Sequence, residues 1–490
     1  MDISQFWQKN KNSILPLILF LGAIITGCLG QFEVTSFFVY TCPVILYFLV
    51  RRLKVWEALP YGLNFGFYFA FSAYLWLTKF ERFDPFIGVE IGYGLVFLIV
   101  FAGSSYLMRK YKDREFVQIF TFAWIFLVLQ TVLHYLSAVG YGKAFIKLVN
   151  NPNYFDWVLP YFGSGMVDAL VFALGFLIAR LIDRYLKGES LKPLQWYSVG
   201  FAILLAIGIF RGSTVPAQGA ADKTVRVAAV QGNFGFEWQK RVDMAPQILD
   251  YFLTTTKEVA KKGAQVVVWP EYAAAVDILT ENPDMSKKIE AASKKLNVVI
   301  VLGSLEHAQP GDSTDKGIGY DLSLVYDPDK GRLEPYRAVY PYSSNIYHGK
   351  KPMIFETKFG NFPVLSCFEI ARHKFVADYF HMGKPIDFIV GIANNQVFDG
   401  TYGPYRLLNH ARRIAGENDR YVMYVTNTAP TSIINRESKV VATVPFQTQG
   451  YTMYDIEKNR EISLYSRFED ILPFVLTTAV FGFVLTQTKA

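Results

Sequence analysis

The sequence predicts a two-part protein, in which a bundle of eight membrane-spanning α-helices is joined to an α/β domain. Charged residues make up only 19% of the chain, below the roughly 25% usual in soluble proteins. This deficit is uneven, because long apolar runs fill the first 210 residues and the stretch from about 222 to 470 has an ordinary soluble composition. Within that stretch, apolar β-rich runs alternate with helix-like segments, which is typical of layered α/β domains.

Eight apolar runs approach the length of about 20 residues that a bilayer requires. Seven precede residue 212 and the eighth ends the chain. The runs cover residues 13–30, 34–50, 58–78, 86–108, 116–138, 165–186, 195–211 and 471–487. We therefore expect a seven-helix region over 1–211, a linker at 212–223, an α/β domain over 224–468 and an eighth helix at 471–487.

Lys and Arg residues are distributed unevenly between the loops that connect these runs. Thirteen lie at the N-terminus and in every second loop, namely Lys9, Lys11, Arg51, Arg52, Lys54, Arg109, Lys110, Lys112, Arg114, Arg180, Arg184, Lys187 and Lys192. The opposite loops hold Lys79, Arg82, Lys143 and Lys147, and Arg211 follows the seventh run. Basic loops stay in the cytoplasm, so we expect both termini inside and residues 212–470 outside. The net charge of +7 thus reflects topology and does not indicate a nucleic-acid partner.

The apolar runs of the α/β domain are continuous, which favours strands buried on both faces. They cover residues 225–233, 265–271, 297–306, 322–328, 362–369, 386–395 and 420–428. Helix-like stretches at 246–262 and 404–417 lie between some of them.

Two of these strands end in residues that are able to perform catalysis. VVVWPEY places Glu271 just after one strand, and VLSCFEI places Cys367 at the end of another. A cysteine nucleophile needs a base to accept its proton, and Glu271 and Glu369 are the acidic candidates. No His adjoins Cys367. The alternative interpretation makes Cys367 a small core residue and Glu271 a solvated loop carboxylate.

Four segments in sequence order resemble the apolipoprotein N-acyltransferase family. They are AAVQGNFGFEW at 228–238, VVVWPEY at 266–272, VLSCFEI at 364–370 and the long run from Ala393 to Thr428. The resemblance covers essentially the whole chain. It implies a multi-pass protein of the bacterial inner membrane, whose periplasmic nitrilase-type αββα sandwich lies between the seventh and eighth helices.

The resemblance also implies a Glu–Lys–Cys triad. Glu271 matches the general base, Cys367 the nucleophile and Glu369 the acidic residue two positions after it. Trp238 matches a tryptophan of the first substrate loop.

Two further positions are similar to family residues that lie near the substrate. Phe368 stands where the family commonly has Tyr, and Asn394 begins an Asn-Asn pair that replaces Asn-Asp.

The implied reaction is a ping-pong acyl transfer that uses no metal and no cofactor. The cysteine takes an acyl chain from a phospholipid as a thioester. It then passes the chain to the free α-amine of a lipoprotein whose N-terminal cysteine carries diacylglycerol. The expected partners are therefore the membrane, a phospholipid donor and a lipoprotein acceptor.

The segment that should carry the family lysine reads YRAVYPYSSN at 336–345 and contains no lysine. Depending on whether two residues are deleted, the lysine position falls on Arg337 or Tyr336. We expect Arg337 to supply the positive charge, because a guanidinium is a permanent cation with several donors. Lys350 and Lys351, in the shortened loop between residues 341 and 367, are the alternative sources.

Three functions are compatible with these observations. The first is lipoprotein N-acylation, the second is a nitrilase-type amidase or acyltransferase with another acceptor, and the third is an inactive domain that binds lipid or lipoprotein. The third predicts no acyl-enzyme at Cys367, and the second predicts an acyl-enzyme that ignores lipoprotein amines.

Overall fold

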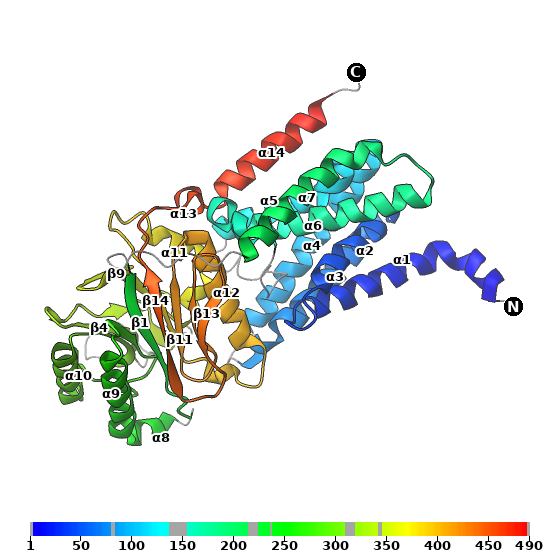
Figure 1. The fold of residues 1–490 in the computed structure, drawn as a ribbon. Coiled ribbons are helices and arrows are strands. Elements are labelled where there is room, and N and C mark those ends of the chain that lie inside the picture. The colour runs from blue at the N-terminus through cyan, green and yellow to red at the C-terminus, as the bar shows by residue number, and fades with distance from the viewer. Residues whose placement is uncertain are drawn as a thin grey trace. The chain divides into compact units, whose positions relative to one another are not determined.

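The computed structural model describes residues 3–79, 84–136, 154–213, 224–235, 238–308, 319–341 and 345–487. The chain divides into two compact units. The first joins residues 1–215 to 468–490 and is helical, and the second comprises residues 216–467 and contains all the described strands (Figure 1). Residues 214–223 of the predicted linker lie outside the described ranges.

Each apolar run predicted from the sequence coincides with a helix in the described part of the chain. The helices are α1 (Ile3–Leu29), α2 (Phe38–Arg52), α3 (Val55–Tyr74), α4 (Asp84–Lys110), α5 (Glu115–Leu136), α6 (Leu159–Leu186), α7 (Gln195–Ser213) and α14 (Ile471–Thr486). Among the described residues, four segments are long and apolar enough to cross a bilayer: Phe86–Lys110, Glu115–Tyr135, Asp156–Leu186 and Lys192–Arg211. Two apolar helices, Ile14–Leu29 and Ile471–Thr486, are shorter. The count of eight spans therefore stays a prediction.

Two glycines allow α3 and α4 to pack closely. A Cβ atom at Gly62 would lie 2.5 Å from the carbonyl oxygen of Phe97, and one at Gly66 would collide with the carbonyl of Tyr93. Small residues spaced four apart are a common means of bringing the backbones of membrane helices together.

Charged side chains near one end of α5 and α6 are paired with each other. Glu115 accepts two hydrogen bonds from Arg180, at 2.7 and 2.8 Å, and one from Arg184 at 2.6 Å. Asp183 pairs with Arg51 of α2. These are the same basic loops that the charge pattern assigns to the cytoplasm.

The α/β unit contains two sheets. The first has the order β14-β1-β2-β3-β4-β5, and β6 and β7 also pair with β4. Its central strands β1, β2 and β3 are parallel. Its strands are β1 (Thr224–Gln231), β2 (Val266–Val268), β3 (Val299–His307), β4 (Gly319–Asp327), β5 (Gly331–Arg332), β6 (Tyr336–Arg337), β7 (Ile346–Tyr347) and β14 (Gly450–Glu457).

The second sheet has the order β13-β12-β11-β10-β9-β8, with β9, β10 and β11 parallel. Its strands are β8 (Ile354–Thr357), β9 (Gly360–Ser366), β10 (Ile389–Ala393), β11 (Val422–Thr426), β12 (Thr431–Ile434) and β13 (Val440–Val444). The α/β unit also contains α8 (Trp238–Asp243), α9 (Ala245–Lys261), α10 (Pro283–Leu296), α11 (His373–Tyr379) and α12 (Gly403–Asn418).

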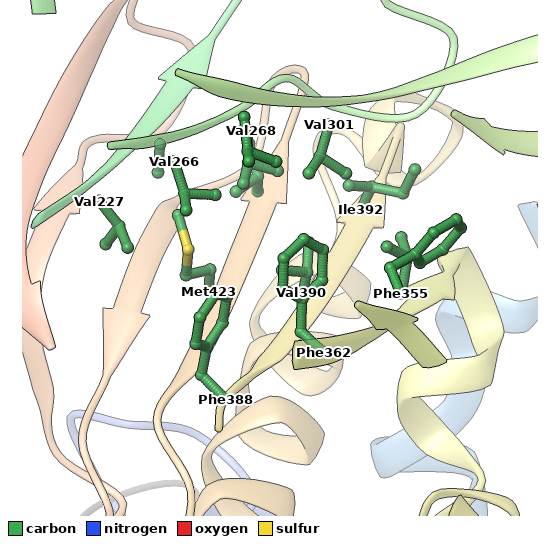
Figure 2. Packing of buried hydrophobic residues seen from close by; sticks show 14 of the residues in the cluster. Val227, Val266, Val268, Val301, Phe355, Phe362, Phe388, Val390, Ile392 and Met423 are labelled. Carbon is green, nitrogen blue, oxygen red and sulfur yellow. The ribbon is translucent and has the colours of Figure 1, made fainter. Parts of the chain in front are cut away.

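The two sheets pack face to face, and helices cover their outer faces. Alternate strand residues point into the space between the sheets, as Figure 2 shows for Val227, Val266, Val268 and Val301 of the first sheet and Phe362, Val390, Ile392 and Met423 of the second. The intervening residues of the first sheet pack against α9 and α10, and α12 lies against the second sheet (Figure 1). Each fully buried side chain of this size contributes about 1.5–3 kcal/mol to folding. The unit is therefore an αββα sandwich, as the nitrilase-type expectation requires.

The sequence located the buried parallel strands better than the exposed elements. The expected strand 362–369 ends at Ser366, because the chain turns sharply at Cys367. Helix α10 and strands β12, β13 and β14 were not among the predicted elements; β14 is largely half-buried, and polar residues interrupt its apolar pattern.

The loop after β2 is attached to β3 through the backbone of Gly303. Gly303 N donates to the Pro270 carbonyl at 3.1 Å, and its carbonyl accepts from Ala274 N at 3.2 Å. A Cβ atom at Gly303 would lie 2.6 Å from the Glu271 Cα. The loop that carries Glu271 thus fits only against a glycine.

We expect Gly303→Ala to lower the free energy of unfolding by about 1–3 kcal/mol, because the new methyl group meets backbone atoms that must shift. The measurement is the thermal unfolding temperature of the purified protein in detergent, followed by circular dichroism. Gly450→Ala is the matched control, since its Cβ would find Val444 at 3.9 Å as the nearest atom. Equal unfolding temperatures for the two variants would contradict the close fit.

Candidate active site

Cys367 lies at the carboxyl end of β9, where the chain enters the 3₁₀ helix η5 (Cys367–Ala371). Its φ angle is +49°, a left-handed conformation that is uncommon outside glycine. Because β9 is hydrogen-bonded to β8 on one side and β10 on the other, the sheet holds this strained residue in place. Cys367 is only 7% exposed, so its thiol is fixed and largely shielded from water.

Glu271 occupies the loop after β2, and its carboxyl group contacts the Cys367 thiol. Its Oε2 accepts the backbone N–H of Asn394 at 2.6 Å, whereas Oε1 has no hydrogen-bond donor among the described residues. Burial raises the pKa of Glu271 to about 7, although the Asn394 N–H and the thiol oppose the shift. A carboxyl with a pKa near neutrality is suited to accepting a proton and returning it.

The Cys367 thiol is protonated at neutral pH. Burial, followed by the negative charges of Glu271 and Asp321, raises the pKa of Cys367 well above that of an ordinary thiol. The sulfur can therefore act as a nucleophile only if a neighbouring group takes its proton during the attack. Glu271 is the neighbouring carboxyl whose charge acts on the thiol, and it is placed to serve as that base.

The Glu369 carboxylate is saturated with hydrogen bonds. Its Oε1 accepts from Tyr336 Oη at 2.7 Å and from the backbone N–H groups of Val339 and Tyr340 at 2.8 and 3.1 Å. Its Oε2 accepts from Ser366 N at 2.9 Å. Burial raises the pKa of Glu369 to about 7 against the effect of these donors. This carboxyl therefore connects the segment after β6 to the turn that presents Cys367.

Two successive residues of β6 point in opposite directions, as strand geometry requires. Tyr336 is buried and reaches Glu369. Arg337 instead donates two hydrogen bonds to Glu306, at 2.6 and 2.7 Å, and lies over the ring of Tyr320. The strand brings Tyr336 to the cluster around Cys367 and holds Arg337 in a separate ion pair. The expectation that Arg337 supplies the charge at the thiol does not agree with this placement.

Asp321 is a third buried carboxyl in the cluster, which the sequence analysis missed. It lies on β4, is 0% exposed, and accepts a hydrogen bond from Ser366 Oγ at 2.6 Å. Burial and the neighbouring charge of Glu271 raise the pKa of Asp321. The sequence signal that could have revealed Asp321 is an acidic residue on the face of β4 that points toward the second sheet. Val325 lies on the same face of β4 and belongs to the core between the sheets.

Arg241 of α8 is the second residue that sequence reasoning missed. It is 2% exposed, and its Nη2 donates to the Tyr272 carbonyl at 2.6 Å. Within the described ranges, its Nε and Nη1 have no hydrogen-bond partner. Burial lowers the pKa of Arg241 to about 10, while the attraction of Glu271 opposes the shift. The buried cation near Glu271 thus comes from α8 and not from the segment at 336–345. No sequence pattern that we recognise distinguishes this arginine.

Phe368, Asn394 and Trp238 are the other predicted site residues. Phe368 is buried, with its ring 5.9 Å from that of Phe398. Asn394 contributes its backbone N–H, and its side-chain oxygen accepts from Asn427 at 3.0 Å. Trp238 is the first residue of α8, and its side chain lies outside the described part of the structure.

The two alternative lysines lie on the surface. Lys350 and Lys351 are exposed, and the Lys351 ammonium is 3.9 Å from Glu334. No group of three or more His, Cys, Asp or Glu residues in the described ranges is arranged to hold a metal ion.

The fold and the Cys–Glu pair at strand ends define the class of the protein. The carbon-nitrogen hydrolase family model matches residues 226–464, which fall within the α/β unit. Among solved structures, an amidase from Nesterenkonia sp. is 14% identical, with a TM-score of 0.39 over 50% of this chain and 95% of its own.

Curated relatives extend the similarity beyond this domain. The apolipoprotein N-acyltransferase of Coxiella burnetii is 24% identical over 89% of this chain and 91% of its own, and that of Haemophilus ducreyi is 22% identical over 98% and 99%. The Synechocystis enzyme of the same name is 25% identical over 64% of each chain. The α/β unit thus matches the carbon-nitrogen hydrolase model, and the chain is similar over most of its length to these apolipoprotein N-acyltransferases.

We expect the alkylation of Cys367 by iodoacetamide, a small uncharged reagent, to depend on the ionisation of Glu271. The rate should rise with pH through an apparent pKa of about 7, because only the carboxylate accepts the thiol proton. Glu271→Gln should abolish this rise and leave only the increase at high pH that reflects direct formation of thiolate. Mass spectrometry of the peptide that contains Cys367 separates it from the other two cysteines. A wild-type midpoint above pH 9, unchanged in Glu271→Gln, would contradict the assignment of the base.

Proposed function

We propose that this protein transfers an acyl chain from a membrane phospholipid to the N-terminal amine of lipoproteins through a thioester at Cys367. The observation that carries the proposal is the buried pair of Cys367 and Glu271, in a chain that is similar over most of its length to curated apolipoprotein N-acyltransferases. The apolar helices of the first unit support a membrane location, where a phospholipid donor is available.

The first half-reaction forms the acyl-enzyme. The Cys367 S–H bond breaks as its proton passes to Glu271, and the sulfur forms a bond to the ester carbonyl carbon of the phospholipid. The ester C–O bond then breaks, and Glu271 returns the proton to the departing lysophospholipid oxygen. A positioned carboxyl used in this way contributes roughly 10²–10⁴ in rate.

The second half-reaction regenerates the thiol. The lipoprotein α-amine attacks the thioester carbonyl, an amide bond forms and the S–C bond breaks. Glu271 takes a proton from the attacking nitrogen and delivers it to the sulfur. A base with a pKa near 7 suits both halves, since it must bind and release a proton in each.

The proposal also assigns residues to substrate binding. We assign Phe368, Asn394, Tyr336 and Trp238 to the walls of the substrate site, and Glu369 to the support of the Cys367 turn. Phe368 follows the nucleophile directly, and Asn394 and Tyr336 each hydrogen-bond to one of the two glutamates.

We expect intact-mass analysis to detect the acyl-enzyme. Purified wild-type protein incubated with phospholipid micelles should gain the mass of one acyl chain, and hydroxylamine should remove it because thioesters are labile to that reagent. Cys367→Ala should gain nothing. Cys28→Ala is the matched control, since Cys28 lies in α1 of the helical unit, and it should be acylated as the wild type is.

Two other outcomes lead to the alternative functions. An acyl-enzyme that does not discharge onto a diacylglyceryl lipopeptide would favour an amidase or an acyltransferase with another acceptor. Absence of any adduct in folded wild-type protein would favour an inactive domain that binds lipid or lipoprotein.

For the topology we propose eight spans, with both termini in the cytoplasm and residues 224–468 in the periplasm, joined through the linker at 212–223. The support is the asymmetry of Lys and Arg between loops, together with the helices that coincide with each apolar run. Arg82, Lys143 and Lys147 of the opposite loops lie outside the described residues.

Alkaline phosphatase, which is active only in the periplasm, should be active when fused after Lys223 and inactive when fused after Lys112. A fluorescent protein that matures only in the cytoplasm should give the opposite pattern and controls for expression. Active phosphatase after Lys112, with none after Lys223, would reverse the orientation.

A further inference from the structure

Asp321 and Glu271 are two buried carboxyl groups that face each other next to the thiol. They come from different parts of the first sheet, since Asp321 lies on β4 and Glu271 follows β2. Asp321 accepts from Ser366, the residue before Cys367. The Glu271 backbone packs against Gly303, which pairs with Ser323 of β4. Each carboxyl acts on the pKa of the other. Asp321 is 0% exposed and Glu271 is 1% exposed, so water does not screen the pair.

Each carboxyl has one oxygen that receives a donor and one that does not. Glu271 Oε2 accepts from Asn394 N, and Asp321 Oδ2 accepts from Ser366 Oγ. In the part of the chain that the structure describes, Glu271 Oε1 and Asp321 Oδ1 have no donor. Two ionised carboxylates in contact repel each other strongly, whereas one shared proton satisfies both remaining oxygens.

We propose that Asp321 is a protonated carboxylic acid that donates a hydrogen bond to the Glu271 carboxylate, and that it acts as the positioning residue for the catalytic base. This inference rests on the proposed function for its role in acyl transfer, but the proton arrangement itself can be tested without any acyl substrate.

The charged and titratable groups around the pair are consistent with a single negative charge. Cys367 is a neutral thiol, and the hydroxyl of Tyr424 on β11 is protonated because burial raises its pKa. Glu369 also acts on Asp321, and its own hydrogen bonds are provided by Tyr336, Ser366 and the segment after β6. Arg241 of α8 is the buried cation that attracts Glu271.

One negative charge shared by the pair is therefore balanced by Arg241. The backbone opposite Asp321 adds no charge, because the residue whose N–H pairs with the Asp321 carbonyl, at 3.0 Å, is the buried Ala338.

A proton held by Asp321 would affect the base in two ways. It stabilises the ionised form of Glu271, since hydrogen bonds to a carboxylate lower its pKa. It also occupies Oε1, which fixes the orientation of the carboxyl toward the thiol. When the Cys367 S–H bond breaks, the proton moves to Glu271 while Asp321 keeps its own proton. No further acid or base is needed for the step.

The test is the pH dependence of Cys367 alkylation by iodoacetamide in Asp321→Asn and Asp321→Ala. An asparagine fits the same space, accepts the Ser366 hydroxyl through its oxygen and donates its amide N–H to Glu271. We therefore expect the Asp321→Asn midpoint to stay within about half a pH unit of the wild type, because the donor is preserved. Asp321→Ala lacks the donor, so its midpoint should rise by about one unit or more.

The opposite shift would overturn the proposal. If Asp321 were ionised, Asp321→Asn would remove a negative charge beside Glu271, and the midpoint would fall by about one unit or more. Equal midpoints in all three proteins would also overturn it, since Asp321 would then have no influence on the base. Asp321→Asn preserves the side-chain volume, so it still separates a protonated Asp321, with an unchanged midpoint, from an ionised one, with a lower midpoint, if Asp321→Ala does not fold.

Asp327→Asn is the matched control, because it makes the same chemical change on the same strand. Asp327 accepts hydrogen bonds from the backbone N–H groups of Asp329, Lys330 and Lys358 and is not part of the cluster. It should lower stability without moving the midpoint. Since alkylation needs no lipid, a failure of acyl transfer with normal pH profiles would count against the proposed function and leave the proton arrangement intact.

Discussion

Removal of the Glu271 carboxyl from water is the physical constraint on which the site depends. Desolvation moves the pKa of this group to about 7, and burial together with the Glu271 charge raises the pKa of the neighbouring thiol. The αββα sandwich provides this environment, because two sheets packed face to face exclude solvent from the ends of their central strands. The packing of the two sheets then brings together Glu271, which follows β2, and Cys367, which follows β9, although they are far apart in the sequence. The fold thus determines both the position and the protonation state of these two groups.

The sequence could predict those groups that follow buried strands. Continuous apolar runs located β2 and β9, and the residues after them, Glu271 and Cys367, are the ones that meet in the structure. The direction of the Arg337 side chain could not be predicted in this way. Whether a residue on a short strand points toward the thiol or away from it depends on register, and β6 has only two residues. A shift of one position reverses the direction of every side chain.

Asp321 and Arg241 illustrate a second limit. An acidic residue in a strand is usually read as solvent-facing, and it becomes informative only when the second sheet is known to cover that face. Arg241 lies in a short helix, and its proximity to Glu271 arises from tertiary packing. In the helical unit the situation is reversed. Apolar length alone located the eight long helices of that unit, because each of them coincides with an apolar run.

The left-handed conformation of Cys367 fixes the direction of its side chain, whatever atom the Cβ carries. The β9 ladder and the turn into η5 orient the Cα–Cβ bond, so the backbone decides where the attacking atom points. Another atom placed on that Cβ, such as the selenium of selenocysteine, would inherit the same trajectory at a lower pKa. Protein engineers could therefore vary the reactivity of the atom on this Cβ while the backbone keeps its direction unchanged.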